Sequence, residues 1–150
     1  MASNLIVIST AFQNAQVIPE EFAGEGRDVS PPLAWRGAPA NTKSFALICN
    51  DPDAPNGNWV HWVLFNIPAS TGSLVMASKG VGVAGDNSWS VGGYRGPMPP
   101  AGSGTHRYFF KVYALDTTLN LPAGATAQQL QQAMQGHVLS EGQLMGKYSR

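Results

Sequence analysis

The sequence carries little charge, and neither sign is in excess. Acidic and basic residues number nine each in 150 residues, and charged residues make up only 12% of the chain. This balance excludes both the basic surface that attracts nucleic acid and an acidic tail. No apolar run approaches the roughly 20 residues that a membrane-spanning helix needs. We therefore expect no nucleic-acid partner and no integral membrane association.

Cysteine is almost absent. Cys49 is the single cysteine, so no internal disulfide can form. The N-terminus also lacks the basic segment and long apolar segment of a secretory signal. Together these features predict a cytoplasmic protein. Cys49 ends an apolar segment, where a buried structural thiol is more usual than a nucleophile, so thiol catalysis is not favoured.

Glycine and proline are abundant, with 17 and 11 residues, and helical periodicity is scarce. Such a composition favours strands joined by turns. Strand patterns cover residues 5–8, 44–50, 59–67, 106–115 and, as a short last strand, 144–148. One helix is predicted between the cap residue Thr126 and Gly136. We predict an all-β fold with minor α, a β-sandwich of two sheets with one short helix in the C-terminal region, forming a single domain over residues 1–150.

The stretch Asp51–Trp62 is the densest in chemistry, with two carboxylates, two prolines, two tryptophans and a histidine. Pro52 and Pro55 stiffen the backbone, and we expect one of the two X–Pro bonds to be cis. Alternation along the strand that follows predicts a common face with the members Trp59, His61, Val63, Phe65 and Ile67.

A second histidine stands at the start of the strand 106–115. His106 and Tyr108 share one face there, so each imidazole has an aromatic neighbour that can wall a small cavity. If the two strands are neighbours, imidazoles, a tyrosine hydroxyl and amides of the loop 92–102 converge as donors, which favours an anion. Asp51 is then expected to orient a histidine.

Catalytic alternatives are weaker on the sequence alone. Gly80–Gly85 matches a dinucleotide-binding string, but the residues after it are not helical. Ser103 lies between two glycines without the full nucleophile-elbow pattern, so it is interpreted as a turn residue. A hydrolase or metalloenzyme using His61, His106 and Asp51 stays open as the alternative function, although no compact metal motif or cysteine pair supports it. No cofactor and no metal is expected.

Four motifs together resemble the phosphatidylethanolamine-binding protein family, in its bacterial and archaeal Raf kinase inhibitor-like branch. They are Asp51-Pro-Asp-Ala-Pro55, Trp59-Val-His-Trp62, Gly93-Tyr-Arg-Gly-Pro-Met-Pro-Pro100 and Thr105-His-Arg-Tyr108. The resemblance implies a β-sandwich of two antiparallel sheets with a pocket for phosphate-like groups at one end. The residues it places at the pocket are Asp51, Pro55, Trp59, His61, Gly96, Pro99, Pro100, His106 and Tyr108.

The function implied is non-catalytic binding of a phosphate or phospholipid head group, with a regulatory role through phosphorylated partners such as a kinase. Charge-assisted hydrogen bonds from both histidines are expected, and binding is expected to weaken as they lose protons. The resemblance also implies a homodimer. Met98 stands where animal members often have glycine, and no pocket-covering C-terminal helix is evident, so a more open pocket or one closed by a second subunit is expected.

Overall fold

The computed structural model describes residues 5–150, and strands dominate it. Six strands form one sheet in the order β2-β9-β8-β4-β5-β7, and three form a second sheet in the order β1-β3-β6. The strands of the larger sheet are β2 (Gln16–Val17), β4 (Ser44–Asp51), β5 (Trp59–Pro68), β7 (Val83–Ala84), β8 (His106–Leu115) and β9 (Val138–Tyr148). Those of the smaller sheet are β1 (Ile6–Ile8), β3 (Leu33–Arg36) and β6 (Ser73–Leu74). The pairings are antiparallel except for the two-residue contact of β2 with β9.

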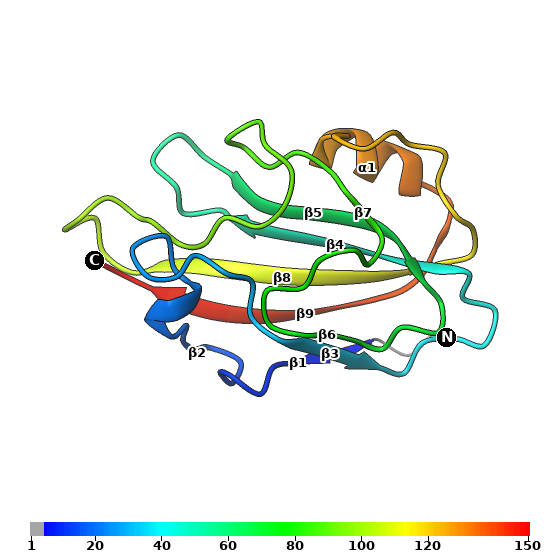
Figure 1. The fold of residues 1–150 in the computed structure, drawn as a ribbon, viewed down its shortest axis with the longest axis horizontal. Coiled ribbons are helices and arrows are strands. Elements are labelled where there is room, and N and C mark those ends of the chain that lie inside the picture. Colours follow the sequence, from blue (N-terminus) through cyan, green and yellow to red (C-terminus); the bar gives the residue numbers. More distant parts are fainter. Residues whose placement is uncertain (1–4) are drawn as a thin grey trace.

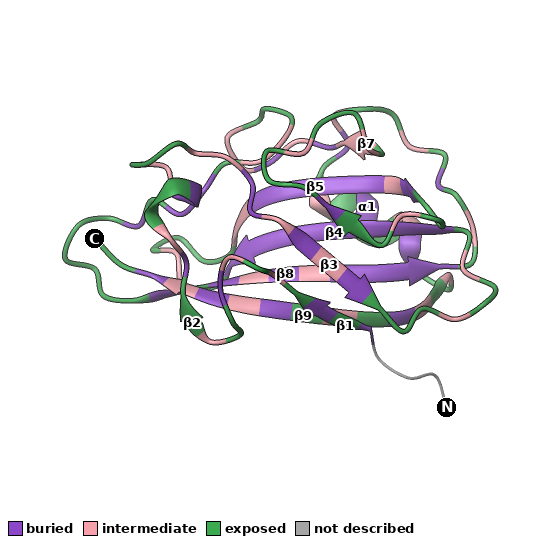
Figure 2. Cartoon of the chain, turned by 60° about the horizontal axis from the view of Figure 1, so that its bottom comes forward, coloured by how far each residue is buried: buried purple, intermediate pink, exposed green. Residues whose placement is uncertain are grey.

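The two sheets and the helix form three layers. The smaller sheet lies along one face of the larger one, and the helix α1 (Ala127–Met134) lies against the other (Figure 1). Between the sheets pack residues such as Val7, Trp35, Leu47 and Phe110, which form the larger core cluster. A second cluster, under α1, includes Leu130. The predicted sandwich with one helix is confirmed, and the central strands β4, β5 and β8 are largely buried (Figure 2).

Helix α1 begins and ends where its sequence signals predict. The Thr126 side chain accepts a hydrogen bond from the Gln129 amide, and the Gln129 side chain accepts one from the Thr126 amide. This reciprocal pair satisfies two amides that the first turn leaves without helical partners. Gly136 follows with φ of 81°, a conformation that glycine adopts at little cost. A short 3-10 helix, η1 (Glu20–Phe22), is the other helical element of the described residues.

The last strand is longer than predicted, because β9 spans Val138–Tyr148 rather than residues 144–148. Gly142 interrupts the hydrophobic alternation of this segment and so weakens the sequence signal. The structure gives the reason for this glycine: a Cβ atom there would lie 2.1 Å from the Leu5 carbonyl oxygen. Close approach of another backbone segment therefore requires glycine within a strand.

Strand β5 departs from simple alternation at two points. The register with β4 shifts between Cys49 and Asn50 and again between Phe45 and Leu47. His61 is the extra residue at the first shift, since Trp62 pairs with Cys49 and Val60 with Asn50. The predicted common face of Trp59, His61, Val63, Phe65 and Ile67 is therefore wrong. Such bulges change the face of the sheet on which side chains lie, and the hydrophobic pattern of the sequence does not reveal them.

The side chains of β5 are therefore distributed over its two faces differently from the prediction. Val63 and Phe65 pack in the cluster under α1, whereas Trp62 and Ile67 pack between the sheets. The His61 ring lies on the intersheet side, where it contacts Tyr108. Burial of β5 on both faces, as the sequence predicts, is confirmed.

Two further expectations concern the backbone and the membrane. No peptide bond among residues 5–150 is cis, so the expected cis bond at Pro52 or Pro55 is wrong. The Asp53 amide donates a hydrogen bond to the Asp51 carboxylate, and the turn that contains Pro52 and Pro55 forms with trans peptide bonds. No helix in the same range is long and apolar enough to cross a bilayer.

Candidate anion-binding site

One end of the larger sheet carries the predicted site residues. Strand β4 ends at Asp51, β5 begins at Trp59 and β8 begins at His106, and these three strand ends are neighbours because β4 lies between β5 and β8. A cavity of about 230 Å³ opens there. Its lining consists of Asp51, Ala54, Pro55, Asn56, Trp59, His61, Trp89, Met98, Pro99, Pro100, His106 and Tyr108. Pockets for drug-sized ligands start at roughly 300 Å³, so this one suits a smaller ligand.

Eight of the nine predicted site residues line this cavity, and Gly96 does not. Gly96 lies behind the wall, where its amide donates to Oδ1 of Asp28 at 2.7 Å. A Cβ atom on Gly96 would lie 2.0 Å from the Phe22 carbonyl oxygen. Its role is thus to let the loop pack closely against the segment around η1.

The pair Asp51 and His106 forms the buried polar centre of the cavity. Oδ2 of Asp51 lies 2.7 Å from Nδ1 of His106, and both side chains are almost fully buried. The carboxylate is an acceptor, so Nδ1 carries a proton and donates it. The expectation that Asp51 orients a histidine is confirmed for His106.

A turn holds Asp51 in place from the other side. The Asp53 amide donates to Oδ1 of Asp51 at 2.7 Å, a side-chain-to-backbone bond that substitutes for a backbone turn. The Asp53 carboxylate accepts three hydrogen bonds from Arg107, one from its amide and two from its guanidinium. These bonds from Arg107 lower the pKa of Asp53 to about 2. The segment after β4 is thereby fixed to the start of β8.

Nε2 of His106 meets Ser103 at the edge of the cavity. The Ser103 hydroxyl lies 3.1 Å from Nε2 and donates to the Pro100 carbonyl oxygen at 2.7 Å. A hydroxyl has one hydrogen, so its contact with the ring is a hydrogen bond only when Nε2 is the donor. Ser103 and Asp51 thus contact the two ring nitrogens of His106 and fix the orientation of its imidazole.

His61 has different neighbours. Its Nδ1 donates to the Arg95 carbonyl oxygen at 2.8 Å, and the Arg95 amide donates back to the His61 carbonyl at 3.0 Å. The ring packs edge-on against Tyr108 and Trp89, with centroid distances of 5.1 Å each. Burial lowers the pKa of His61 from its usual 6.5, and nearby carbonyls and carboxylates offset this effect only in part. His61 is therefore neutral at pH 7, which corrects the expectation of two charged histidines.

The Tyr108 hydroxyl is a buried donor without a hydrogen-bond partner. Tyr108 is 1% exposed and lines the cavity. Burial and then the Asp51 charge raise the pKa of Tyr108, so the hydroxyl keeps its proton. Asp51 thus lies near, but the hydroxyl completes no hydrogen bond of normal geometry. Because buried polar groups in proteins are nearly always paired, this donor indicates a missing acceptor in the cavity.

Apolar and aromatic groups make up the rest of the wall. Trp59 and Trp89 meet edge to face at 5.4 Å, and the Arg95 guanidinium lies 5.7 Å from the Trp89 ring centre. Met98 at the mouth is 44% exposed. Trp89 was missed by the sequence reasoning because it lies in the irregular segment 69–100, which has no periodicity. An aromatic in such a glycine-rich loop is the only signal that could have pointed to it.

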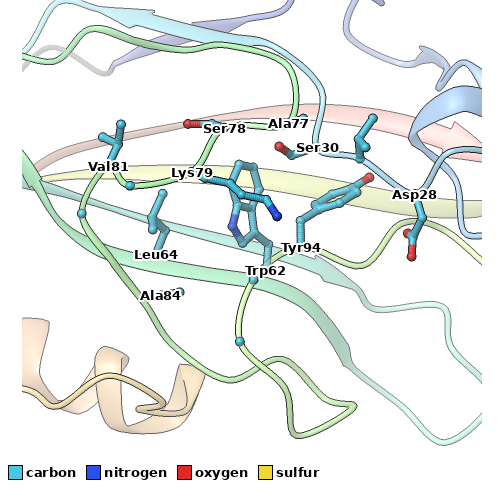
Figure 3. Close-up of a pocket in the computed structure, with 15 residues that line it drawn as sticks. Asp28, Ser30, Trp62, Leu64, Ala77, Ser78, Lys79, Val81, Ala84 and Tyr94 are labelled. Atoms are coloured by element: carbon cyan, nitrogen blue, oxygen red, sulfur yellow. The ribbon is translucent and has the colours of Figure 1, made fainter.

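A larger cavity of about 410 Å³ is lined in part by Gly92, Gly93 and Tyr94, the residues just before Arg95. Trp62, Lys79 and Tyr94 are among the residues that line it (Figure 3). The Tyr94 hydroxyl already donates to the Phe22 carbonyl oxygen. This cavity contains none of the nine predicted site residues, and its tyrosine is satisfied, so we place the candidate site in the smaller cavity.

Comparisons with known proteins agree with this architecture. The family model described as phosphatidylethanolamine-binding protein matches residues 8–149. The chain belongs to the phosphatidylethanolamine-binding protein family. The Gly80–Gly85 string contains the short strand β7 and is not followed by the helix that a dinucleotide-binding motif needs.

One relative and two solved structures illustrate the similarity. A "UPF0098 protein" of Methanothermobacter thermautotrophicus is 48% identical, and the match covers 93% of this chain and 95% of that protein. The crystal structure of a phosphatidylethanolamine-binding protein homologue from Chlamydia trachomatis has a TM-score of 0.93 at 36% identity and covers 98% of both chains. Escherichia coli YbcL, described as a member of the mammalian family, has a TM-score of 0.91 at 28% identity, with 99% of both chains covered.

Proposed function

We propose that this protein binds a small phosphate-like anion in the smaller cavity and does not transform it. The observation that carries the proposal is the Tyr108 hydroxyl, a buried donor that completes no hydrogen bond of normal geometry among residues 5–150, although the Asp51 carboxylate lies near. An oxygen of a bound oxyanion would supply that acceptor. Removing a partner from a buried polar group costs about 1–3 kcal/mol, so a ligand that restores one gains a comparable amount.

The same residues support hydrolysis less well. A chain of side-chain contacts runs from Ser103 to His106 and on to Asp51, as in a serine hydrolase. However, the Ser103 hydroxyl donates its hydrogen to the Pro100 carbonyl oxygen rather than to the imidazole. A nucleophilic serine must give its proton to the histidine. Ser103 is also absent from the cavity lining. These contacts support a positioning role for Ser103, and the alternative of a hydrolase is not favoured.

The described residues contain no cluster of side chains that could bind a metal ion. Among residues 5–150, no three His, Cys, Asp or Glu side chains are placed to hold a metal ion together. His61 uses Nδ1 for a backbone carbonyl, and Asp51 and His106 use their facing atoms for each other. The alternative of a metalloenzyme built on His61, His106 and Asp51 is therefore not favoured either.

The test is the substitution Tyr108→Phe, which removes only the hydroxyl. We expect the affinity for inorganic phosphate, measured by isothermal titration calorimetry, to fall about tenfold, because one hydrogen bond to the ligand is lost. The matched control is Tyr113→Phe, on the opposite face of the same strand, which should leave the affinity unchanged. Equal phosphate affinity of wild type and Tyr108→Phe would contradict the proposal.

Several finer features are part of the proposal and come from the family resemblance. They are a regulatory role through a phosphorylated partner such as a kinase, a homodimer and a cytoplasmic location. The exposed Met98 at the mouth of the cavity supports contact with a partner molecule at this end of the sheet. Phosphate and a phospholipid head group would each present an unprotonated phosphate oxygen to Tyr108.

A further inference from the structure

The free polar atoms of the cavity are of two opposite kinds. The Tyr108 hydroxyl is a donor without a partner. Nε2 of His61 also has no hydrogen bond within the described part of the chain, whereas Nδ1 is committed to the Arg95 carbonyl. A neutral imidazole with its proton on Nδ1 offers a lone pair at Nε2. Among its buried histidine and tyrosine groups, the cavity therefore presents one donor, the Tyr108 hydroxyl, and one acceptor, Nε2 of His61, while Asn56, Trp59 and Trp89 add further polar atoms to the lining.

The packing around His61 keeps the ring neutral. Tyr108 and Trp89 contact it edge-on, and the residue is 3% exposed. Desolvation disfavours the charged form and lowers the pKa of His61. Four groups oppose this effect, the carbonyls of Arg95 and Gly96 and the carboxylates of Asp51 and Asp28, and they do not overcome it.

The remaining charges do not favour a highly charged ligand. Asp51, at the end of β4, places a carboxylate in the wall, and its partner His106, at the start of β8, is already hydrogen-bonded to it. Arg95 is exposed and lies over the outer aromatic Trp89. A fully ionised oxyanion would bring its charge toward Asp51 and an oxygen lone pair toward Nε2 of His61.

We propose that the cavity selects a phosphate-type oxyanion that still carries a proton. Its P–OH group donates to Nε2 of His61, and an unprotonated oxygen accepts from the Tyr108 hydroxyl. This inference rests on the proposed function and narrows its ligand class. The protein would thus separate hydrogen phosphate and protonated phosphate monoesters from fully ionised oxyanions of the same shape.

Sulfate is the matched probe for this selection. At about pH 8, sulfate and most inorganic phosphate are both tetrahedral dianions, but only hydrogen phosphate carries a proton, and a histidine of low pKa is neutral. We expect wild-type protein to bind phosphate about tenfold or more tighter than sulfate by calorimetry, since sulfate cannot complete the bond to Nε2.

The substitution His61→Asn isolates the nitrogen concerned. The Asn amide nitrogen takes the place of Nδ1 and can keep the bond to the Arg95 carbonyl, while no atom replaces Nε2. The ratio of phosphate to sulfate affinity should fall toward one in this variant. His137→Asn is the matched control, because His137 is exposed and pairs with Asp116 away from the cavity, and it should keep the wild-type ratio.

Each outcome is decisive. Equal binding of phosphate and sulfate by the wild type would overturn the selection while leaving the proposed anion site intact. A wild-type ratio that persists in His61→Asn would overturn the assignment to Nε2. If neither anion binds the wild type, the proposed function fails and this inference fails with it.

Discussion

The β5 and β8 walls of the cavity each contribute a histidine, and the two histidines have different hydrogen-bond partners. His61 on β5 lies on a bulge, faces a backbone carbonyl and loses hydration without gaining a carboxylate partner. His106 on β8 pairs with the buried Asp51 and contacts Ser103. The same side chain thus donates to a backbone carbonyl on one wall and to a carboxylate on the other. The neighbouring groups, not the residue type, decide what each imidazole can do.

The strongest test of this difference removes the carboxylate from the β8 wall. Asp51→Ala should lower the free energy of unfolding by about 3 kcal/mol, because it leaves the buried His106 without its partner. The matched control is Asp116→Ala, which removes the partner of His137. Side-chain exposures are 5% for Asp51 and 39% for Asp116, so the control should cost less than about 1 kcal/mol. Similar losses in urea unfolding would contradict the distinction.

The β5 wall is tested through pH. The unfolded chain takes up a proton at His61 near pH 6.5, whereas the folded protein resists it because the pKa is lowered. The lowered pKa of His61 therefore does not change the free energy of unfolding above about pH 6.5, and it reduces that free energy as the pH falls below this value. Between about pH 7.5 and about pH 5.5, the wild type should lose more stability than His61→Asn.

Urea unfolding at both pH values measures this effect. Tyr113→Phe changes no histidine and should lose as much stability as the wild type over the same interval. If His61→Asn also loses as much as the wild type, the neutral form of His61 does not account for the acid sensitivity.

The smallest effect is expected at the exposed pair Arg107 and Asp53, which joins the turn after β4 to the start of β8. Arg107→Lys replaces the two guanidinium bonds to Asp53 by a single point charge. The pair is solvent-exposed, so phosphate affinity should change within about twofold. Calorimetry with inorganic phosphate measures it. A loss as large as that of Tyr108→Phe would show that the turn after β4 depends on this pair far more than its exposure suggests.

Local signals in the sequence predicted much of the fold. The strand β8 alternates as expected, with Tyr108, Phe110 and Val112 in the intersheet core. The helix α1 has its cap and its stop in the sequence. The length of strand β9 exceeds the prediction because Gly142 interrupts its hydrophobic pattern. This glycine allows the backbone at Leu5 to approach closely, and no local pattern in the sequence reveals that contact. The bulges of β5 likewise arise from its register with β4.

The candidate site divides in the same way. Asp51, His61, His106 and Tyr108 were found because unusual residues cluster at predicted strand ends. Trp89 and the contact of Ser103 with His106 were not, since both come from loops whose path depends on the assembled sheets. The exclusion of Gly96 from the lining has the same origin.

The sequence by itself determined the strand-rich fold, the family and the set of polar residues that meet at one end of the larger sheet. Those outcomes depend on local pattern and on motifs, which are present in the chain before it folds. Only the tertiary structure decided the chemical roles. A bulge turned His61 toward a carbonyl, a neighbouring strand supplied Asp51 to His106, and burial left the Tyr108 hydroxyl without an acceptor. Protonation and pairing depend on solvent exclusion and distance, which exist only in the folded protein.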